Sequence, residues 1–358
     1  MKRVLYFVSL VTLTTMFSCN KAENSSLVQA DVVSAPLSLV TKAYGDKTPK
    51  LVVYVETNDV NPLNAGDYCL GCSSCDSCST CSPVVDVVEL FAANIHKETV
   101  NNTTRPTLYL NDKLTPVLEY GGYLDYVAPL QAKGIKVLLT VLGDWQGIGV
   151  ANMDDTQATQ FATILAKVVD RYNLDGIGFD DEYAGYSGSL VSGSFGNIIT
   201  KLHALLPSNK LITVFQWGNY SQISSTAGAL IDYAYHGYFG TSSYYYITSS
   251  SISGVTNDRW SPLSLNLGNT YNSNTVKTRA TSAKNGGYGA IMCFNLRPRS
   301  DVDPLPVFNA IAEGAYGSTA MACSCSITDP TISAGDRPRD AGSITGGFTI
   351  TYDDVLNW

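Results

Sequence analysis

Short apolar runs recur along the chain from residue 51 to residue 295, and each has the length of a β-strand. Consecutive positions within these runs are apolar, which is typical of parallel strands that are covered on both faces. The segments that we expect to be strands are Leu51–Glu56, Val84–Phe91, Val137–Leu142, Gly176–Asp180, Leu211–Gln216, Tyr233–Tyr238, Pro262–Asn266 and Ala290–Asn295.

Helical patterns lie between several of these strands. Apolar residues at positions 161, 164, 165 and 168 predict a helix over Thr156–Tyr172. Phe195–Leu206 has a similar pattern, and Asn274–Lys284 ends before a Gly-Gly pair that is typical of a helix C-terminus. Strands that alternate with helices predict the α/β class and a (β/α)8 TIM barrel, for which about 250 residues suffice. We expect some of its helices to be irregular or incomplete.

The N-terminus does not follow this pattern. Lys2 and Arg3 precede the apolar run Val4–Phe17, which is too short to span a bilayer and has the length of the apolar part of a signal peptide. The run ends at Ser18-Cys19, which resembles the cleavage site of a bacterial lipoprotein. An acylated Cys19 would attach the protein to the membrane without crossing it. We therefore expect an exported protein, anchored by lipid to the bacterial cell envelope.

These patterns divide the chain into four parts: a signal peptide over 1–19, a polar tether over 20–45, the barrel over 46–316 and a C-terminal extension over 317–358. The extension is rich in Gly, Ser, Thr and Asp, and Phe348–Tyr352 alternates like a strand. Packing across the bottom of the barrel and a mobile tail are both compatible with its sequence.

Composition narrows the range of functions. The 358 residues are 45% hydrophobic, which is ample for a large core, and the net charge is −8 with no basic block. The absence of a basic block argues against nucleic acid as a partner. The 22 tyrosines suit sugar-binding surfaces, and they suit ordinary half-buried positions equally well. We expect a monomer without a metal ion or cofactor.

Five cysteines follow one another at a spacing of three residues: Cys69, Cys72, Cys75, Cys78 and Cys81. Such spacing binds zinc or an iron–sulfur cluster in some proteins, but disulfide bonds are favoured in an exported chain. The cluster lies in the long loop Asp59–Pro83 after the first strand, on the side where barrel enzymes keep their active sites. The loop is either a border of the substrate groove or a surface insertion.

The most informative stretch is LDGIGFDDEYAGY, from Leu174 to Tyr186. Side chains alternate between the two faces of a strand, so Gly178, Asp180 and Glu182 share one face and Asp181 takes the other. Two carboxyl groups two residues apart, at the end of a buried strand, form a candidate acid/base pair for cleavage of a glycosidic bond.

This stretch resembles the DGxDxDxE signature of glycoside hydrolase family 18, and in particular the Endo H and Endo F1 group of endo-β-N-acetylglucosaminidases. The resemblance covers roughly Leu51–Tyr316 and includes further motifs in the same order. These motifs are VVYVETNDVNPLNAGDY (Val52–Tyr68), FAANIH (Phe91–His96), GIKVLLTVLGDWQGIGVANM (Gly134–Met153), DYAYHGYFGT (Asp232–Thr241) and GGYGAIMCFNLRPRSD (Gly286–Asp301).

The resemblance implies hydrolysis of the GlcNAc-β1,4-GlcNAc bond in the core of N-glycans, with retention of configuration. In this family the N-acetyl group of the substrate attacks the anomeric carbon. Glu182 would then be the general acid, and Asp180 would orient the acetamido group and stabilise the oxazolinium charge. Because two nearby carboxyl groups raise the pKa of one of them, we expect Glu182 to be protonated near neutral pH.

Two positions depart from the family pattern. The middle Asp of the signature is Gly178 here, which should leave space in the barrel and weaken turnover or shift the pH optimum. A rise in rate in Gly178→Asp would show that the missing group matters. In the sixth strand, His236 replaces an Asn that holds the N-acetyl group. His236 is either a hydrogen-bond donor to substrate or a satisfied buried histidine.

Other substrate-binding candidates come from the ends of strands, where barrel enzymes place their sites. They are Glu56, Asn94, Trp145, Gln216, Trp217, Tyr235, His236, Tyr238 and Asn295. Two alternatives to the endoglycosidase hypothesis stay open: a glycan-binding protein with weakened catalysis on the same barrel, and a chitinase-like hydrolase.

Overall fold

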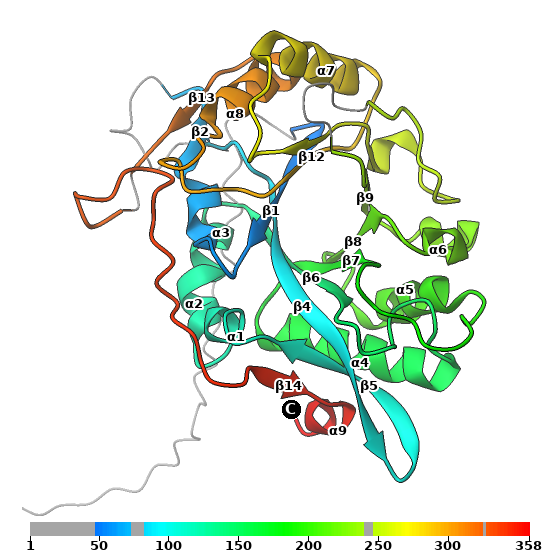
Figure 1. Ribbon diagram of the computed structural model, residues 1–358. Helices are drawn as coiled ribbons and strands as arrows, with labels where there is room; N and C mark the ends of the chain where they lie inside the picture. Colours follow the sequence, from blue (N-terminus) through cyan, green and yellow to red (C-terminus); the bar gives the residue numbers. More distant parts are fainter. Residues whose placement is uncertain (1–46, 73–81, 240–245, 325–326) are drawn as a thin grey trace, which may run out of the picture. The chain divides into compact units, whose positions relative to one another are not determined.

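The computed structural model describes residues 47–72, 82–239, 246–324 and 327–358 (Figure 1). The expected signal peptide, Cys19 and the tether lie outside these residues, as do Cys75, Cys78 and Cys81. Within the described residues, no helix is long and apolar enough to cross a bilayer.

Parallel strands form the ring that the sequence predicts (Figure 1). The sheet runs in the order β10-β9-β8-β7-β6-β4-β1-β12-β11. The strands are β1 (Lys50–Glu56), β4 (Val87–Val100), β6 (Lys136–Gly143), β7 (Gly176–Asp180), β8 (Leu211–Gln216), β9 (Tyr233–His236), β10 (Trp260–Ser261), β11 (Ser264–Asn266) and β12 (Ala290–Phe294).

Two short strands fill the seventh position, and the predicted segment Pro262–Asn266 contains only the second of them, β11. β10 pairs with β9, and β11 pairs with β12, so the two pieces occupy one position in the ring between their neighbours. The residues between the pieces still contribute, because the Met292 amide donates a hydrogen bond to the Leu263 carbonyl at 3.0 Å. The barrel therefore has eight positions, as the sequence predicts, and is nearly closed.

Helices surround the ring, and several are short, as expected (Figure 1). The three helices predicted from periodicity are confirmed as α4, α5 and α7. The α-helices are α1 (Thr115–Leu118), α2 (Gly122–Tyr126), α3 (Ala128–Ala132), α4 (Asp155–Arg171), α5 (Ser194–Leu205), α6 (Ser225–Gly228), α7 (Ser273–Asn285), α8 (Leu305–Ile311) and α9 (Tyr352–Leu356).

The helix α4 shows how sequence determines these elements. Asp154 accepts a hydrogen bond from the Gln157 amide at 2.8 Å, and the Gln157 side chain returns a bond to the Asp154 amide, which forms a capping box. The apolar positions of α4 are fully buried against the outer face of the barrel. On the neighbouring helix, Phe195 packs edge to face against Phe179 of β7.

A hairpin extends the second strand beyond the prediction. β4 continues from the expected end at Phe91 to Val100, and β5 (Thr103–Leu110) returns antiparallel to it. Asn101 and Asn102 form the turn with φ of 50° and 62°. Positive φ at both central residues matches the two-residue hairpin turns that favour asparagine.

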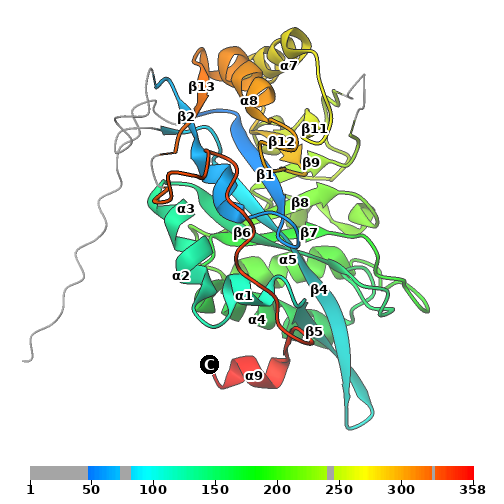
Figure 2. The same ribbon diagram turned by 60° about the vertical axis from the view of Figure 1, so that its left-hand side comes forward.

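The described residues of the C-terminal extension pack against the barrel. β13 (Ala320–Ala322) pairs with β2 (Tyr68–Leu70), which also pairs with β3 (Ser82–Pro83), and β14 (Phe348–Ile350) pairs with β5. Between these strands, Arg339 donates to the Thr57 carbonyl at 2.7 Å, just after the carboxyl end of β1. Figure 2 shows the extension passing this side of the ring and reaching α9.

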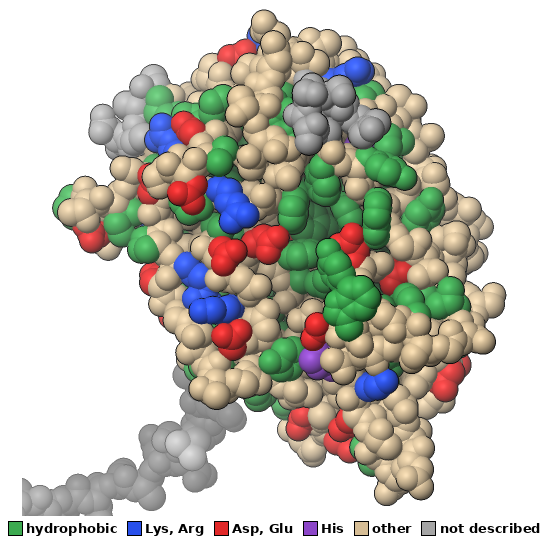
Figure 3. Space-filling model, viewed as in Figure 1, with side chains coloured by type: hydrophobic (Ala, Val, Ile, Leu, Met, Phe, Trp, Pro, Cys, Tyr) green, Lys and Arg blue, Asp and Glu red, His purple; other side chains and the backbone are tan. Residues whose placement is uncertain are grey.

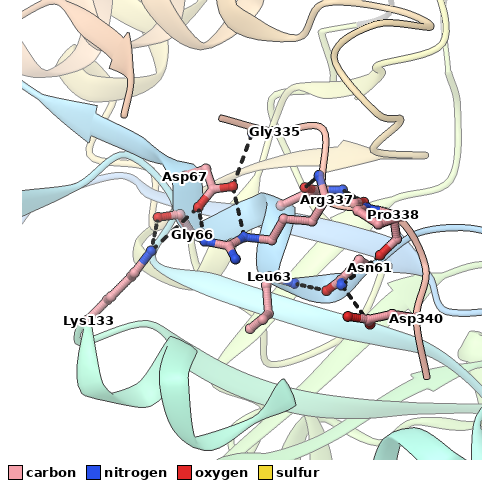
Figure 4. A network of polar contacts seen from close by, with 10 residues as sticks. Asn61, Leu63, Gly66, Asp67, Lys133, Gly335, Arg337, Pro338 and Asp340 are labelled. Carbon is pink, nitrogen blue, oxygen red and sulfur yellow. Dashed lines mark hydrogen bonds and ion pairs between the residues drawn. The ribbon is translucent and has the colours of Figure 1, made fainter. Parts of the chain in front are cut away.

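An ion pair fastens the extension to the turn η1 (Pro62–Asp67), as Figure 4 shows. The Arg337 guanidinium binds both oxygens of the fully buried Asp67 carboxylate at 3.1 Å, and Lys133 approaches the same carboxylate at 3.7 Å. Nearby, the Asn61 side chain donates to the Pro338 carbonyl at 2.9 Å. A two-point contact of this kind fixes the extension in one register.

Candidate active site

The end of β7 places three neighbouring carboxyl groups in different environments. Asp180 closes the strand on the inner face of the barrel and is 4% exposed, whereas Asp181 turns outward. Glu182 follows on the inner side and is half-buried. This alternation is the one that the sequence predicts for a strand.

Asp181 holds the turn after β7 in place. Its Oδ2 accepts hydrogen bonds from the amide and the side chain of Asn219, both at 2.7 Å, and its Oδ1 accepts one from the Tyr186 hydroxyl. Gly218 has a φ of 59° and packs directly on Asp181, where a Cβ would overlap it. The glycine therefore allows the loop after β8 to close on the carboxylate.

Backbone pairing continues from the strands into the loops above them. The Gly143 amide donates to the Glu182 carbonyl at 2.9 Å, and the Gly147 amide donates to the Ala184 carbonyl at 2.9 Å. A Cβ on Gly143 would overlap the backbone of Ala184. Glu182 is thus carried on a backbone that is held on one side by the loop after β6 and on the other by Asp181.

Asp180 and Glu182 open into one cavity of about 270 Å³ at the carboxyl end of the barrel. Figure 3 shows a hollow on this face, with hydrophobic side chains in it and acidic side chains at its edge. The cavity is lined by Tyr54, Glu56, Phe91, Asp180, Glu182, Tyr183, Phe215, Gly237, Phe239, Met292 and Phe294. Aromatic walls with a few acidic groups suit a ligand that has both apolar faces and polar edges.

Burial and the charges of neighbouring carboxylates raise the pKa of both Asp180 and Glu182. Burial raises the pKa of Asp180 well above its usual value, and the charges of Glu182 and then Asp181 add to this effect. Burial also raises the pKa of Glu182, and the charge of Asp181 contributes. The geometry therefore holds protons at the site at a higher pH than isolated carboxyl groups would.

Glu56 is a third carboxyl group in the cavity. Burial raises its pKa, the nearby charge of Arg297 opposes this shift, and Asp59 reinforces it. Arg297 lies 4.0 Å from Asp59, so the two form an ion pair beside the cavity. Glu56 is therefore placed to accept or donate hydrogen bonds at the cavity wall.

The predicted aromatic residues lie at the surface near the cavity. Trp145 is 71% exposed and lies 5.9 Å from the ring of Tyr183, which lines the cavity. Trp217 and Tyr238 are also exposed and meet edge to face at 5.9 Å. We call Trp145, Tyr183, Trp217 and Tyr238 the rim aromatics.

The prediction that His236 and Tyr235 line the substrate site is not supported by their positions. His236 is fully buried, its Nε2 lies 3.1 Å from the Pro262 carbonyl, and its Nδ1 accepts from the Tyr238 amide at 3.3 Å. Burial lowers the pKa of His236 to about 4, so the ring is neutral. Tyr235 is fully buried in the barrel interior, outside the cavity wall. His236 is thus a satisfied buried histidine.

Three other candidates bond to protein groups and do not line the cavity. Gln216 is 7% exposed and accepts from the Ser251 amide at 2.8 Å, which fixes the loop after β9. The Asn94 side chain donates to the Gly143 carbonyl at 3.3 Å, and that of Asn295 donates to Asn266 Oδ1 at 3.2 Å. Asn295 follows β12 as predicted, whereas Gln216 is the last residue of β8 and Asn94 lies within β4, which is longer than expected.

Several cavity residues were not predicted, and most of them are aromatic. Tyr54 precedes Glu56 by two positions on β1 and therefore shares its inner face. The same spacing rule would have selected it from the sequence. Phe215 and Phe294 belong to apolar runs, where nothing distinguishes an inner aromatic residue from an outer one.

Gly178 does not leave the space that the sequence suggests. The carboxyl group of Glu89, on β4, lies where a side chain at position 178 would be. Glu89 stands within an apolar strand, and sequence analysis did not select it. The expectation of an empty position behind Asp180 is therefore wrong.

The described residues contain no cluster of His, Cys, Asp or Glu side chains that could hold a metal ion. Cys72 is disulfide-bonded, in agreement with the disulfide interpretation for this one member of the cluster. Cys293 is buried in β12, and burial raises the pKa of its thiol, as expected for a small core residue.

No protein-family model matches the chain. The chain is 34% identical over 281 residues to an endo-β-N-acetylglucosaminidase of Flavobacterium sp. (strain SK1022), covering 76% of this chain and 82% of that protein. It is 32% identical over 313 residues to endo-β-N-acetylglucosaminidase F1 of Elizabethkingia meningoseptica, covering 83% and 85%.

Solved structures show the same fold. EndoBT-3987 of Bacteroides thetaiotaomicron, solved with Man5GlcNAc product, has a TM-score of 0.64 at 26% identity and covers 85% of this chain and 67% of that chain. A chitinase of Rhizomucor miehei, at 15% identity and a TM-score of 0.51, covers 74% and 99% and shares the fold alone. The chain therefore belongs to the endo-β-N-acetylglucosaminidases of glycoside hydrolase family 18.

Proposed function

We propose that this protein hydrolyses the β-1,4 bond between the two GlcNAc residues of N-glycan cores. The observation that carries the proposal is that Asp180 and Glu182 open together into a cavity with aromatic walls. EndoBT-3987 has also been solved with Man9GlcNAc2Asn substrate, which favours N-glycans of the oligomannose type as the first substrates to test.

In the proposed mechanism Glu182 is the general acid and then the general base. It gives its proton to the glycosidic oxygen while the acetamido oxygen of the substrate attacks the anomeric carbon, and the bond to the leaving sugar breaks. Water then adds to the anomeric carbon and returns a proton to Glu182. The raised pKa of Glu182 supports the first step, because the group must be protonated when substrate binds.

Asp180 is proposed to orient the acetamido group. Its inner position and nearly complete burial allow it to accept the acetamido N–H and to stabilise the positive charge of the oxazolinium intermediate. Holding the acetamido oxygen near the anomeric carbon makes the attack intramolecular, which supplies much of the rate.

The aromatic walls are proposed to hold the sugar at the point of cleavage. Tyr54, Phe91, Phe215, Phe239 and Phe294 offer flat surfaces for the apolar faces of a pyranose ring. The rim aromatics lie nearer the surface and offer stacking positions for sugars beyond the one at the point of cleavage.

We further propose that the protein is exported as a monomer and anchored to the bacterial membrane through Cys19. The support comes from the sequence, in which a basic start, an apolar run and Ser18-Cys19 follow in order. A lipid anchor followed by a polar tether would leave the barrel free to meet glycoproteins.

The direct test is release of oligosaccharide from a high-mannose glycoprotein by the purified protein. Glu182→Gln should lower the rate by about 10²–10⁴-fold, because it removes the proton donor while preserving shape. Glu313→Gln is a matched control, since Glu313 pairs with Lys277 on the surface and should leave the rate unchanged. Undiminished release by Glu182→Gln would disprove the assigned role, and no release by the natural protein from any N-glycan class would disprove the proposed function.

A further inference from the structure

A buried carboxyl group that the proposed mechanism does not use lies inside the barrel. Glu89 of β4 is fully buried, and its two oxygens accept hydrogen bonds from Thr140 at 3.0 Å and Thr213 at 2.6 Å. Thr140 belongs to β6 and Thr213 to β8, the two strands on either side of β7. The carboxyl group therefore spans β7.

The residue of β7 between the two threonines is Gly178. Thr140 pairs with Gly178 in the register of β6 and β7, and Thr213 pairs with Gly178 in that of β7 and β8. A Cβ on Gly178 would overlap Glu89 Oε2 and would lie 2.9 Å from Thr213 Oγ1. The glycine thus makes room for the carboxyl group of Glu89.

This position is next to the catalytic pair. Gly178 precedes Asp180 by two residues, so Glu89 is on the inner face of β7 one step below Asp180. Among the described residues, neither Asp180 Oδ1 nor the Tyr54 hydroxyl has a hydrogen-bond partner, although both are nearly fully buried. Tyr54 is a further polar group of this interior layer.

We propose that Glu89 is a positioning residue of the active site, which supplies from β4 the interior carboxyl group that Gly178 does not supply from β7. It does not touch the substrate and acts through Asp180, by influencing the charge and orientation of that group. This inference rests on the proposed function, because it assumes that Asp180 and Glu182 carry the reaction.

The electrostatics of the interior agree with such a role. Burial raises the pKa of Glu89 to about 7, against the opposing effect of the two threonine hydrogen bonds. In addition to burial, the charge of Glu89 raises the pKa of Tyr54 of β1 and of Tyr235 of β9. Asp180 follows Gly178 by two positions on β7. Burial raises the pKa of Tyr54 well above its usual value, and the charges of Glu89 and Asp180 both add to that shift, so Tyr54 lies within reach of both carboxyl groups.

The first test is the pH profile of Glu89→Gln, which keeps the size of the side chain and one accepting oxygen, while its amide nitrogen can donate to the other threonine hydroxyl. Below pH 6 the variant should match the natural protein, because Glu89 is then protonated and neutral. Above pH 7 the natural protein gains a negative charge behind Asp180 that the variant lacks. The alkaline limb of kcat/KM should therefore move to lower pH by about one unit in the variant, because a like charge raises the pKa of its neighbours.

The second test moves the carboxyl group from one strand to the other. Glu89→Ala should lower kcat about tenfold, with little change in KM. A tenfold loss corresponds to a change of about one unit in the pKa of Asp180. Gly178→Asp alone should also lower kcat, because two carboxyl groups then crowd one position. The double variant Glu89→Ala/Gly178→Asp should recover most of the lost kcat and the alkaline limb of the natural protein.

Glu119→Gln is the matched control. Glu119 is a buried carboxyl group that binds Arg171 and Tyr172 and lies outside the cavity lining. It should change stability without moving the pH profile. An unchanged pH profile in Glu89→Gln, or a folded double variant with the kcat of Glu89→Ala, would refute the positioning role. Full activity of Glu182→Gln would instead refute the proposed function itself, so the two failures are distinguishable.

Discussion

Carboxyl groups in this site acquire their roles from the backbone position that each occupies. Asp180, Asp181 and Glu182 are adjacent in the chain, yet one is buried inward, one is bonded outward and one is half-buried. Asp181 receives hydrogen bonds from three donors and stabilises the turn. Alternation along the chain thus separates the two acids that line the cavity from the one that stabilises the turn.

The raised pKa of Glu182 predicts the pH range in which activity is lost. An acid whose pKa is raised keeps its proton up to a higher pH, and its function as a proton donor is lost as the pH rises through that value. The alkaline limb of kcat/KM on a high-mannose glycopeptide should therefore lie clearly above 4.5, the ordinary glutamate value. A limb at or below 4.5 in a pH–rate profile would contradict the assignment of Glu182 as the acid.

Single site residues could be predicted only where the alternation of side chains along a strand, or a position at the end of a strand, provided a rule. Asp180, Glu182 and Glu56 were found in this way and line the cavity. Glu89 was missed because its partner is a glycine on another strand, and the register between β4 and β7 depends on the pairing of both strands with β6. His236 was assigned a site role because sequence could not show that the Pro262 carbonyl and the Tyr238 amide already engage its ring.

Elements outside the regular βα repeat were harder to predict than the barrel itself. The eight apolar runs and three periodic helices were predicted correctly because burial on both faces leaves a strong signal. The β4–β5 hairpin was missed, although Asn101-Asn102 between alternating residues is a hairpin signal. The position of the C-terminal extension depends on contacts such as Arg337 with Asp67, which are distant in sequence.

The extension should contribute to stability through one buried ion pair. Arg337→Ala leaves the Asp67 carboxylate buried with Lys133 at 3.7 Å as its remaining cation, and should cost roughly 3–5 kcal/mol of the free energy of unfolding. Urea unfolding measures this loss. Arg339→Ala is the comparison, because Arg339 bonds only to backbone carbonyls in the described contacts and should cost less. Equal losses of unfolding free energy in the two variants would show that the buried Asp67 charge does not cause the loss of stability in Arg337→Ala.

At the scale of the whole molecule, the sequence predicts a lipid anchor before the barrel. The proposed lipid anchor predicts that Cys19→Ser moves the protein from the membrane fraction to the soluble fraction of the cell envelope. Fractionation followed by immunoblotting, with glycan release measured on both fractions, checks this. Equal distribution of the natural and variant proteins would exclude acylation at Cys19 as the anchor.

The ring is closed by its first and last strands, since Lys50 of β1 pairs with Ala290 of β12. Nearly all of the chain must therefore leave the ribosome before β1 can acquire both neighbours. A product that stops before β12 would leave one edge of the mostly apolar strand β1 unpaired, and such edges recruit other chains into aggregates. Premature termination before Ala290, the first residue of β12, should thus yield insoluble protein in place of a weakened enzyme.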